Sequence, residues 1–107
     1  MSMTESQLQD HIRLALGREP GLVLWRNNCG AAEINGRRLA YGVGNPGGAD
    51  LIGVWHGRFI AIEIKTPTGR QSEAQRVFEQ LVTRNGGIYV VLRSVEEAHG
   101  FISQHRR

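Results

Sequence analysis

The sequence predicts a mixed α/β sandwich, in which helices pack against a central sheet. Three short patterns with a Ser or Thr followed three residues later by Gln or Glu each precede apolar residues at helical spacing. Short runs rich in Val, Ile and Leu lie between these helices and end at glycines, as buried strands do. An Asn35-Gly36 pair, a strong hairpin signal, joins two further segments. The 107 residues are expected to form one domain, 1–107.

The N-terminal half is predicted to hold one helix, one strand and a β-ribbon. Thr4 and Gln7 form a capping box, so a helix is expected to start at Glu5. Gly17 ends that helix. The following elements are a strand at 22–25, a ribbon of strands at 31–34 and 37–41, and a glycine-rich loop at 42–48.

The C-terminal half is predicted to hold a hairpin, two helices and one more strand. Ser72 with Gln75 and Ser94 with Glu97 are the second and third capping boxes. The elements are strands at 49–55 and 58–65, a loop at 66–71, a helix after Ser72 that Gly86-Gly87 closes, a strand at 88–92, and a helix from Ser94 to His105 with Phe101 and Ile102 facing the core. The element order is α-β-(ββ)-β-β-α-β-α.

Composition narrows the choice of partner. The formal net charge of +3 suits a polyanion such as nucleic acid, although a mildly basic domain without such a partner is the alternative. No window approaches the roughly 20 apolar residues of a membrane span, so no membrane partner is expected. Cys29 is the only cysteine, which fits a reducing, cytoplasmic location. Cys29 and Trp25 are both expected to be buried.

Lysine usage singles out one position. Twelve of the 13 basic residues are arginine, and the single lysine is Lys65, in the tripeptide Glu63-Ile64-Lys65. Arginine stays charged in proteins, whereas a lysine can exchange its proton. The only lysine therefore lies where proton exchange would matter.

The hairpin register brings two acids together. If His56-Gly57 is a two-residue turn, Asp50 falls directly opposite Glu63. Opposed residues have Cβ atoms roughly 4.5–5.5 Å apart, where like charges repel. A divalent cation would compensate them, because Mg²⁺ is held by one or two carboxylates with waters and phosphate oxygens. Lys65 shares the face of Glu63 and could orient a water. A surface salt bridge among the three is the alternative.

These motifs resemble the PD-(D/E)XK nucleases, and in particular their VRR-NUC branch. The resemblance lies in Gly47 to Ile52, a Gly-Gly-x-Asp-Leu-Ile stretch, in the Glu-x-Lys strand, and in the Ser-x-x-Gln start of the next helix. It covers nearly the whole chain. Ala49 stands where that family usually has proline, a residue that shapes the backbone and carries no chemistry.

The resemblance implies a restriction-endonuclease-like three-layer core and a metal-dependent endodeoxyribonuclease. It implies that Asp50, Glu63 and the backbone carbonyl of Ile64 hold Mg²⁺ or Mn²⁺, and that Lys65 positions or activates the attacking water. A glutamate of the first helix often joins such sites, and Glu5 is the matching residue; an acid favourable to the first helical turn is the alternative. Gln75 matches a glutamine beside the site.

Short free-standing members suggest branched DNA such as Holliday junctions as substrate, a homodimer, and a bacterial or phage source. The ribbon and the last helix are both candidate dimer surfaces. The alternatives are a flap or single-strand nuclease, a non-catalytic nucleic-acid-binding module on the same fold, and a subunit of a larger complex. The intact Asp50, Glu63 and Lys65 argue against the non-catalytic module.

DNA contacts are expected from basic and polar residues, among them a basic pair at the predicted tip of the ribbon. They are Arg26, Asn27, Arg37, Arg38 and Arg70. An ordinary strand end at Arg26 and Asn27, and a solvated turn at Arg37 and Arg38, are the alternatives. Residues 42–47 also match the dinucleotide pattern G-x-G-x-x-G, but a strand follows them instead of a helix, so a flexible loop leading to Asp50 is expected.

Overall fold

The computed structural model describes residues 3–106, with three helices and six strands in this range. The elements are α1 (Glu5–Leu16), β1 (Leu22–Arg26), β2 (Gly30–Ile34), β3 (Arg37–Tyr41), β4 (Leu51–Trp55), β5 (Arg58–Ile64), α2 (Glu73–Arg84), β6 (Ile88–Leu92) and α3 (Val95–His105). A four-stranded sheet has the order β1-β4-β5-β6, antiparallel except for the parallel β5–β6 pair. The predicted mixed α/β class is confirmed.

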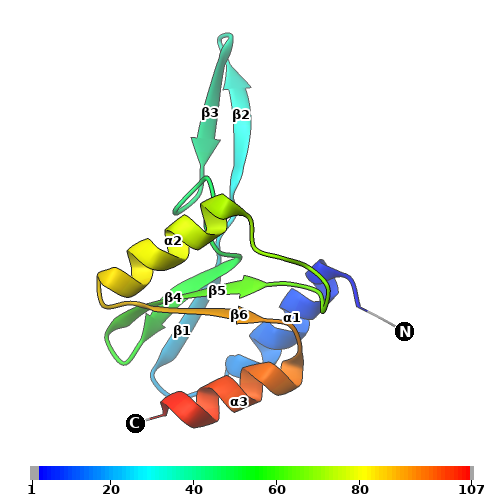
Figure 1. Cartoon of the computed structure of the whole chain (residues 1–107), viewed down its shortest axis with the longest axis vertical. Helices are drawn as coiled ribbons and strands as arrows, with labels where there is room; N and C mark the ends of the chain where they lie inside the picture. Colours follow the sequence, from blue (N-terminus) through cyan, green and yellow to red (C-terminus); the bar gives the residue numbers. More distant parts are fainter. Residues whose placement is uncertain (1–2, 107) are drawn as a thin grey trace.

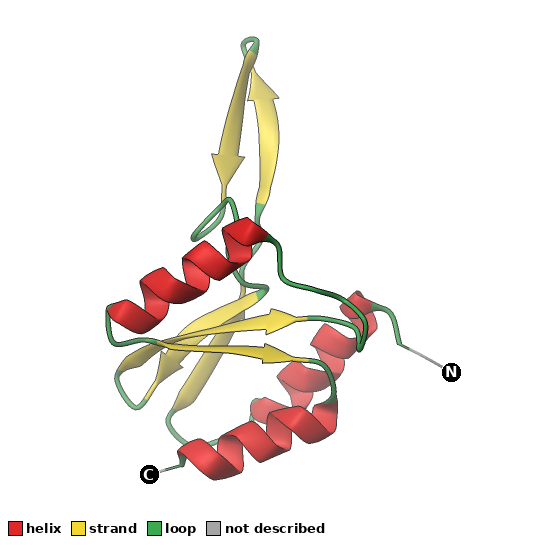
Figure 2. Cartoon of the chain, in the orientation of Figure 1, coloured by secondary structure: helices red, strands yellow, loops and turns green. Residues whose placement is uncertain are grey.

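The sheet is the middle of three layers. Helices α1 and α3 cover one face and α2 covers the other (Figures 1 and 2). Successive β5 residues alternate between the layers, because strand side chains point to opposite faces. Ile60, Ile62 and Ile64 belong to the larger core with α1 and α3, while Ala61 packs with Phe78 of α2. Glu63, which alternates with the isoleucines, is therefore on the α2 side.

The predicted starts of all three helices are confirmed. The prediction of a complete capping box is wrong only for Ser94 and Glu97. Thr4 with Gln7 and Ser72 with Gln75 make complete boxes. Ser94 accepts from the Glu97 N–H, but the Glu97 carboxylate accepts from the backbone N–H of Arg93 instead of closing onto Ser94. The neighbouring peptide offers the better placed donor.

Helix α2 covers only part of its sheet face. It packs over Ala61 and Ile52, and leaves β1 and the outer part of the hairpin open. Trp25 of β1 is consequently 54% exposed, so its predicted burial is wrong. Val23 pairs with Val54, and Val54 with Phe59, which makes an exposed apolar row across three strands beside Trp25.

Strands β2 and β3 form a separate ribbon that projects from the body (Figure 1). Two asparagines fix its base. Asn27 donates its amide to the carbonyls of Val43 and Ala49, at 2.8 and 2.9 Å, and its oxygen accepts from the Val43 N–H at 3.0 Å. Asn45 donates to the carbonyls of Gly30 and Tyr41, both at 2.7 Å. The glycine-rich loop predicted to be flexible is thus tied to β1 and to both ribbon strands.

Close approach to α2 explains one glycine of this loop. Gly44 has φ +77°, and a Cβ there would collide with the ring of Phe78. The loop leads into β4 and not into a helix, as expected, so it lacks the structural context of a dinucleotide site. None of the helices in residues 3–106 is long and apolar enough to cross a membrane.

Asn27 should be a stability residue. We expect Asn27→Ala to lower the free energy of unfolding by about 1–3 kcal/mol, because it leaves backbone groups of the loop without partners. Asn28→Ala is the matched control, since Asn28 is the exposed neighbour in the same segment. Urea unfolding of both variants measures the difference, and equal stabilities would contradict the assignment.

Candidate active site

The β4–β5 hairpin brings the two predicted acids together. The observed register runs from Trp55 opposite Arg58 to Leu51 opposite Ile62, as predicted. His56 and Gly57 have φ of 50° and 81°, the left-handed conformation that a type I′ turn requires. Asp50 and Glu63 come next on the two strands. Asp50 Oδ2 accepts a 2.7 Å hydrogen bond from the backbone N–H of Ile64, which holds its carboxylate beside the end of β5.

Glu63 is buried and only partly satisfied. Its side chain is 3% exposed. Its Oε2 accepts from Gln75 Nε2 at 2.7 Å and lies 3.6 Å from Lys65 Nζ. Within residues 3–106, its Oε1 is buried and has no hydrogen-bond partner. A surface salt bridge, the alternative considered from sequence, does not describe this burial.

The electrostatics of the site favour a bound cation. Burial, then the negative charge of Asp50, raise the pKa of Glu63 to about 8, while Lys65 opposes the rise. The folded chain therefore holds a proton on this carboxyl more readily than a solvated glutamate does. A divalent ion would replace that proton and satisfy the free oxygen, since metal binding requires deprotonated ligands.

The donor set fits a hard cation such as Mg²⁺. Asp50 and Glu63 supply carboxylate oxygens, and the peptide of Ile64 lies next to Asp50. The described part of the chain has no group of three or more His, Cys, Asp and Glu residues that could hold a metal. Two carboxylates are nevertheless a usual protein contribution to Mg²⁺, whose other positions are taken by waters and phosphate oxygens.

Gln75 links the site to the start of α2. Its Oε1 accepts from the Ser72 backbone N–H at 2.8 Å, and its backbone N–H donates to Ser72 Oγ at 3.1 Å. Its Nε2 is thereby left to point at Glu63. The glutamine predicted beside the site is in contact with a candidate metal ligand, and it both caps the helix and orients the carboxylate.

Helix α1 approaches the site through a residue that sequence reasoning did not select. A polar pocket of about 150 Å³ beside Asp50 is lined by Gln9, together with Arg26 and Cys29. Glu5, one turn earlier, is exposed and joins no three-residue acidic group with Asp50 and Glu63 in the described range. The helical spacing of Glu5 and Gln9 places both on one face, so it was a signal for Gln9 as well.

The remaining predicted DNA contacts differ in position. Arg26 lines the pocket beside Asp50, and Arg70 is exposed in the loop after Lys65. The Asn27 amide is bonded to Val43 and Ala49 at both ends, so the geometry gives Asn27 a structural role at the base of the ribbon. Arg37 and Arg38 lie on the ribbon. Cys29 is exposed, which corrects its predicted burial.

Arg93 supports the loop that follows Lys65, a role that sequence reasoning missed. Its guanidinium donates to the carbonyls of Thr66 and Gly69, at 2.8 and 2.6 Å. The Lys65 N–H donates to Leu92 O at 3.1 Å. The end of β6 therefore holds both Lys65 and the loop that carries Arg70. No short sequence pattern marks this contact, because the partners are more than 20 residues apart.

The fold is similar to that of a solved structure described as a VRR_NUC domain. The two share a TM-score of 0.65 and 15% sequence identity, and the match covers 99% of this chain and 100% of that chain. No protein-family model and no curated protein matches the sequence. The VRR-NUC resemblance seen in the sequence is thus confirmed at the level of fold, with a central mixed sheet flanked by helices.

The raised pKa of Glu63 predicts a pH-dependent effect of Glu63→Gln on metal-free stability. The folded pKa of about 8 exceeds the ordinary value of 4.5, so the stability from the neutral carboxyl is complete below pH 4.5 and is lost by about pH 8. Glu63→Gln should therefore stabilise the protein, relative to wild type, more at pH 9 than at pH 5.

Urea unfolding in EDTA at both pH values measures this difference. Glu33→Gln, at an exposed ribbon position, is the matched control and should shift stability equally at the two pH values. A Glu63→Gln effect that is the same at pH 5 and pH 9 would contradict a carboxyl that titrates near 8.

Proposed function

We propose that this chain is a Mg²⁺-dependent endonuclease that hydrolyses DNA phosphodiester bonds, with Mn²⁺ as a substitute. The observation that carries the proposal is the buried Glu63 carboxylate, which has one free oxygen and lies beside Asp50 at the end of an apolar hairpin. Such an arrangement is costly unless a cation compensates it. The VRR_NUC fold adds support. So do Lys65 and Gln75, which the sequence resemblance assigns to such a site and which both contact Glu63.

Asp50, Glu63 and the Ile64 carbonyl would hold the ion. When bound, Mg²⁺ supplies positive charge to phosphate oxygens and lowers the pKa of water. The Ile64 N–H and the Gln75 amide fix the two carboxylates in one orientation, so the ligands need little rearrangement. Ligand orientation by such outer contacts typically changes metal affinity or activity by about 10- to 100-fold.

Lys65 would position the attacking water. Its ammonium group is 3.6 Å from Glu63 Oε2 and its side chain is 13% exposed. Lys65 is two residues beyond Glu63, so both side chains project from the same face. From there it can donate a hydrogen bond to a water and offset negative charge on the phosphate. Arg26 beside Asp50 and Arg70 beyond Lys65 would bind flanking phosphates.

Branched DNA, including Holliday junctions, is the proposed substrate, within a bacterial or phage-infected cytoplasm. The net charge of +3 supports a polyanionic substrate without selecting its shape. Flap and single-stranded DNA are the alternative substrates. A non-catalytic binding module is disfavoured, because Lys65 and Gln75 both contact Glu63.

Separate measurements of metal binding and cleavage test the proposal. Linear duplex, flap, single-stranded and four-way junction DNA are incubated with the protein, with and without Mg²⁺. Asp50→Asn should lose Mn²⁺ affinity and cleavage, while its side chain can still accept from the Ile64 N–H and keep the fold. Lys65→Ala should bind Mn²⁺ but lose cleavage, and Lys65→Arg should not restore it.

Asp10→Asn, at an exposed position of α1, is the control for removal of an acid outside the site. Unchanged calorimetric Mn²⁺ affinity in Asp50→Asn would overturn the metal site. Wild-type cleavage by Lys65→Arg would leave Lys65 only its positive charge. A wild-type protein that binds DNA and cuts none of the four substrates would favour the non-catalytic module.

We also propose a homodimer, because two symmetric cuts in a four-way junction require two sites. Phe101 and Ile102 of α3 are 8% and 3% exposed, within the core, so these two side chains do not form the contact. Of the exposed apolar surfaces, we select the row of Val23, Val54 and Phe59 beside Trp25, ahead of the ribbon. It lies on a sheet that the core already holds in place, next to the free edge of β1.

Light scattering at micromolar concentration tests the dimer. Wild type should give about twice the chain mass of 11.9 kDa, and Val54→Asp should reduce it to one chain. A wild-type mass near 11.9 kDa, unchanged by junction DNA, would refute the dimer. With strand-specific labels, cleavage of a flap without paired cuts in a junction would select the flap nuclease instead.

A further inference from the structure

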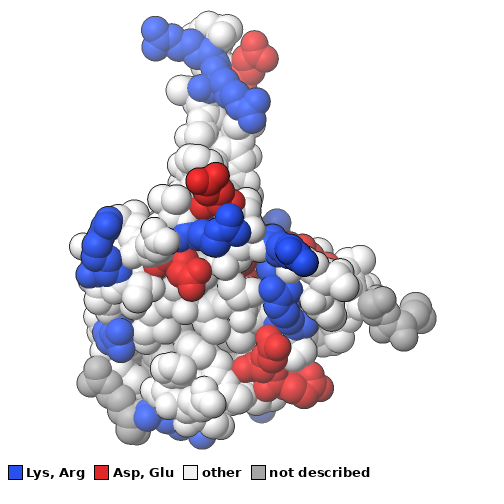
Figure 3. Space-filling view, viewed as in Figure 1, with Lys and Arg blue, Asp and Glu red and all other residues white. Residues whose placement is uncertain are grey.

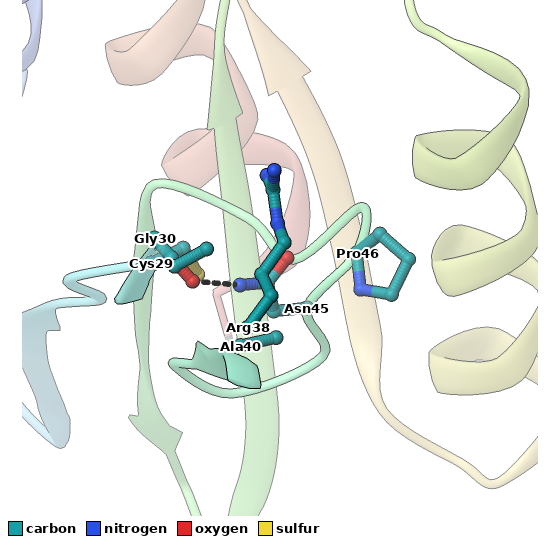
Figure 4. A pocket seen from close by; sticks show the side chains of 7 residues that line it. Cys29, Gly30, Arg38, Ala40, Asn45 and Pro46 are labelled. Atoms are coloured by element: carbon teal, nitrogen blue, oxygen red, sulfur yellow. Dashed lines mark hydrogen bonds between the residues drawn. The ribbon is translucent and has the colours of Figure 1, made fainter. Parts of the chain in front are cut away.

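A groove lies at the base of the ribbon, outside the group of residues around Asp50 and Glu63. Its volume is about 410 Å³. Ala31 and Ala40 form its ribbon side, Pro46 comes from the glycine-rich loop, and the side chain of Arg38 extends along it (Figure 4). Small side chains leave room for a bulky ligand to approach the backbone.

Strand alternation gives the ribbon two different faces. Ala31 is paired with Ala40 and Glu33 with Arg38, so these four residues share the face that carries the groove. Arg37 alternates with Arg38 and therefore lies on the opposite face, with the exposed apolar residues Ile34, Leu39 and Tyr41. The two arginines, expected to act as one basic pair, are separated by the structure.

The residues that line the groove include one arginine, and Glu33 on the same ribbon face is not among them. None of its lining residues is acidic. Arg38 is exposed, and among residues 3–106 it has no carboxylate within salt-bridge distance, although Glu33 is its cross-strand partner. The Asn45 amide is committed to the Gly30 and Tyr41 carbonyls, which leaves Arg38 as the strong donor. Figure 3 shows basic groups on the projecting ribbon with one acidic group beside them.

The groove and the pocket beside Asp50 have Cys29 as a common lining residue. Ala31 and Arg38 also line the groove, and Gln9, Arg26 and Asp50 also line the pocket. A ligand that occupies both spaces is extended, and it is anionic where it meets Arg26 and Arg38. A nucleic-acid strand has this shape and charge.

We infer that the groove binds the sugar–phosphate backbone of one DNA strand that runs from Asp50 past Cys29, with Arg38 on a phosphate beyond the bond to be cut. The inference rests on the proposed nuclease function, which is what places the DNA strand at Asp50. It assigns the ribbon a task in binding substrate: Arg38 is a binding residue and takes no part in the chemistry.

Binding in EDTA tests the groove without cleavage. The probe is a fluorescein-labelled single-stranded oligodeoxynucleotide, followed by anisotropy across a salt series. Arg38→Gln should weaken binding roughly five- to tenfold, as loss of one hydrogen bond in an exposed groove does. It should also weaken the salt dependence, so that the slope of log K against log salt concentration becomes less negative by about 0.7. With Mg²⁺, the loss should appear in KM more than in kcat.

Two arginines provide the comparison. Arg37→Gln removes the same charge from the opposite ribbon face and should weaken binding clearly less than Arg38→Gln. Arg84→Gln removes it at the far end of α2 and should bind as wild type does. Equal losses of DNA affinity in Arg37→Gln and Arg38→Gln would mean that DNA binds to the general positive charge of the ribbon and not in the groove. Wild-type affinity in Arg38→Gln would also contradict binding in the groove.

A second pair of variants tests the space and keeps every charge. Ala40→Leu fills the groove and should weaken binding as Arg38→Gln does. Ala32→Leu makes the same change on the opposite face, where Ala32 pairs with Leu39, and should bind normally. Equal affinities for the two would overturn the inference. If wild type cuts no DNA while the Arg38 and Ala40 effects persist, the nuclease proposal fails and the groove stands.

Discussion

The repulsion between Asp50 and Glu63 is the constraint around which the body of this protein is arranged. The hairpin turn and its register place these two acids at adjacent strand ends, and α2 then covers Glu63 from water. Two acids in such surroundings stay together only if one of them keeps its proton or if other groups hold their charges. The Ile64 N–H, the Gln75 amide and the Lys65 ammonium do so, each from a different neighbouring position. Because both acids lie at strand ends of the central sheet, the sheet holds their backbone positions fixed.

The hairpin geometry was predictable because its determinants are local. His56-Gly57 fixes the turn, the turn fixes the register, and the register sets Asp50 against Glu63. The two complete helix caps follow from side chains three residues apart. In each case the interacting groups are close in sequence or are related by strand periodicity, so the pattern of residue types is sufficient.

The misjudged features depend on contacts between distant parts of the chain. Trp25 is apolar and lies in a strand, which favoured burial, but the placement of α2 over the far side of the sheet leaves it exposed. The structural role of Asn27 was not predicted, because only the folded loop brings the Val43 and Ala49 carbonyls to its amide. Gln9 faces the pocket beside Asp50 because of how α1 crosses the sheet. No local pattern encodes these arrangements.

The double use of Gln75 bears on how this site can be transplanted or altered by insertion. A residue added in the loop before Ser72 leaves the capping pattern intact, but it changes the length of chain that joins β5 to Gln75. A residue added within the first turn would rotate the side chains beyond it by about 100°. Loop length and helix phase are therefore linked through Gln75, which contacts both Ser72 and Glu63. A protein engineer who grafts the acids onto another sheet must carry over the loop, the serine and the glutamine as one cassette.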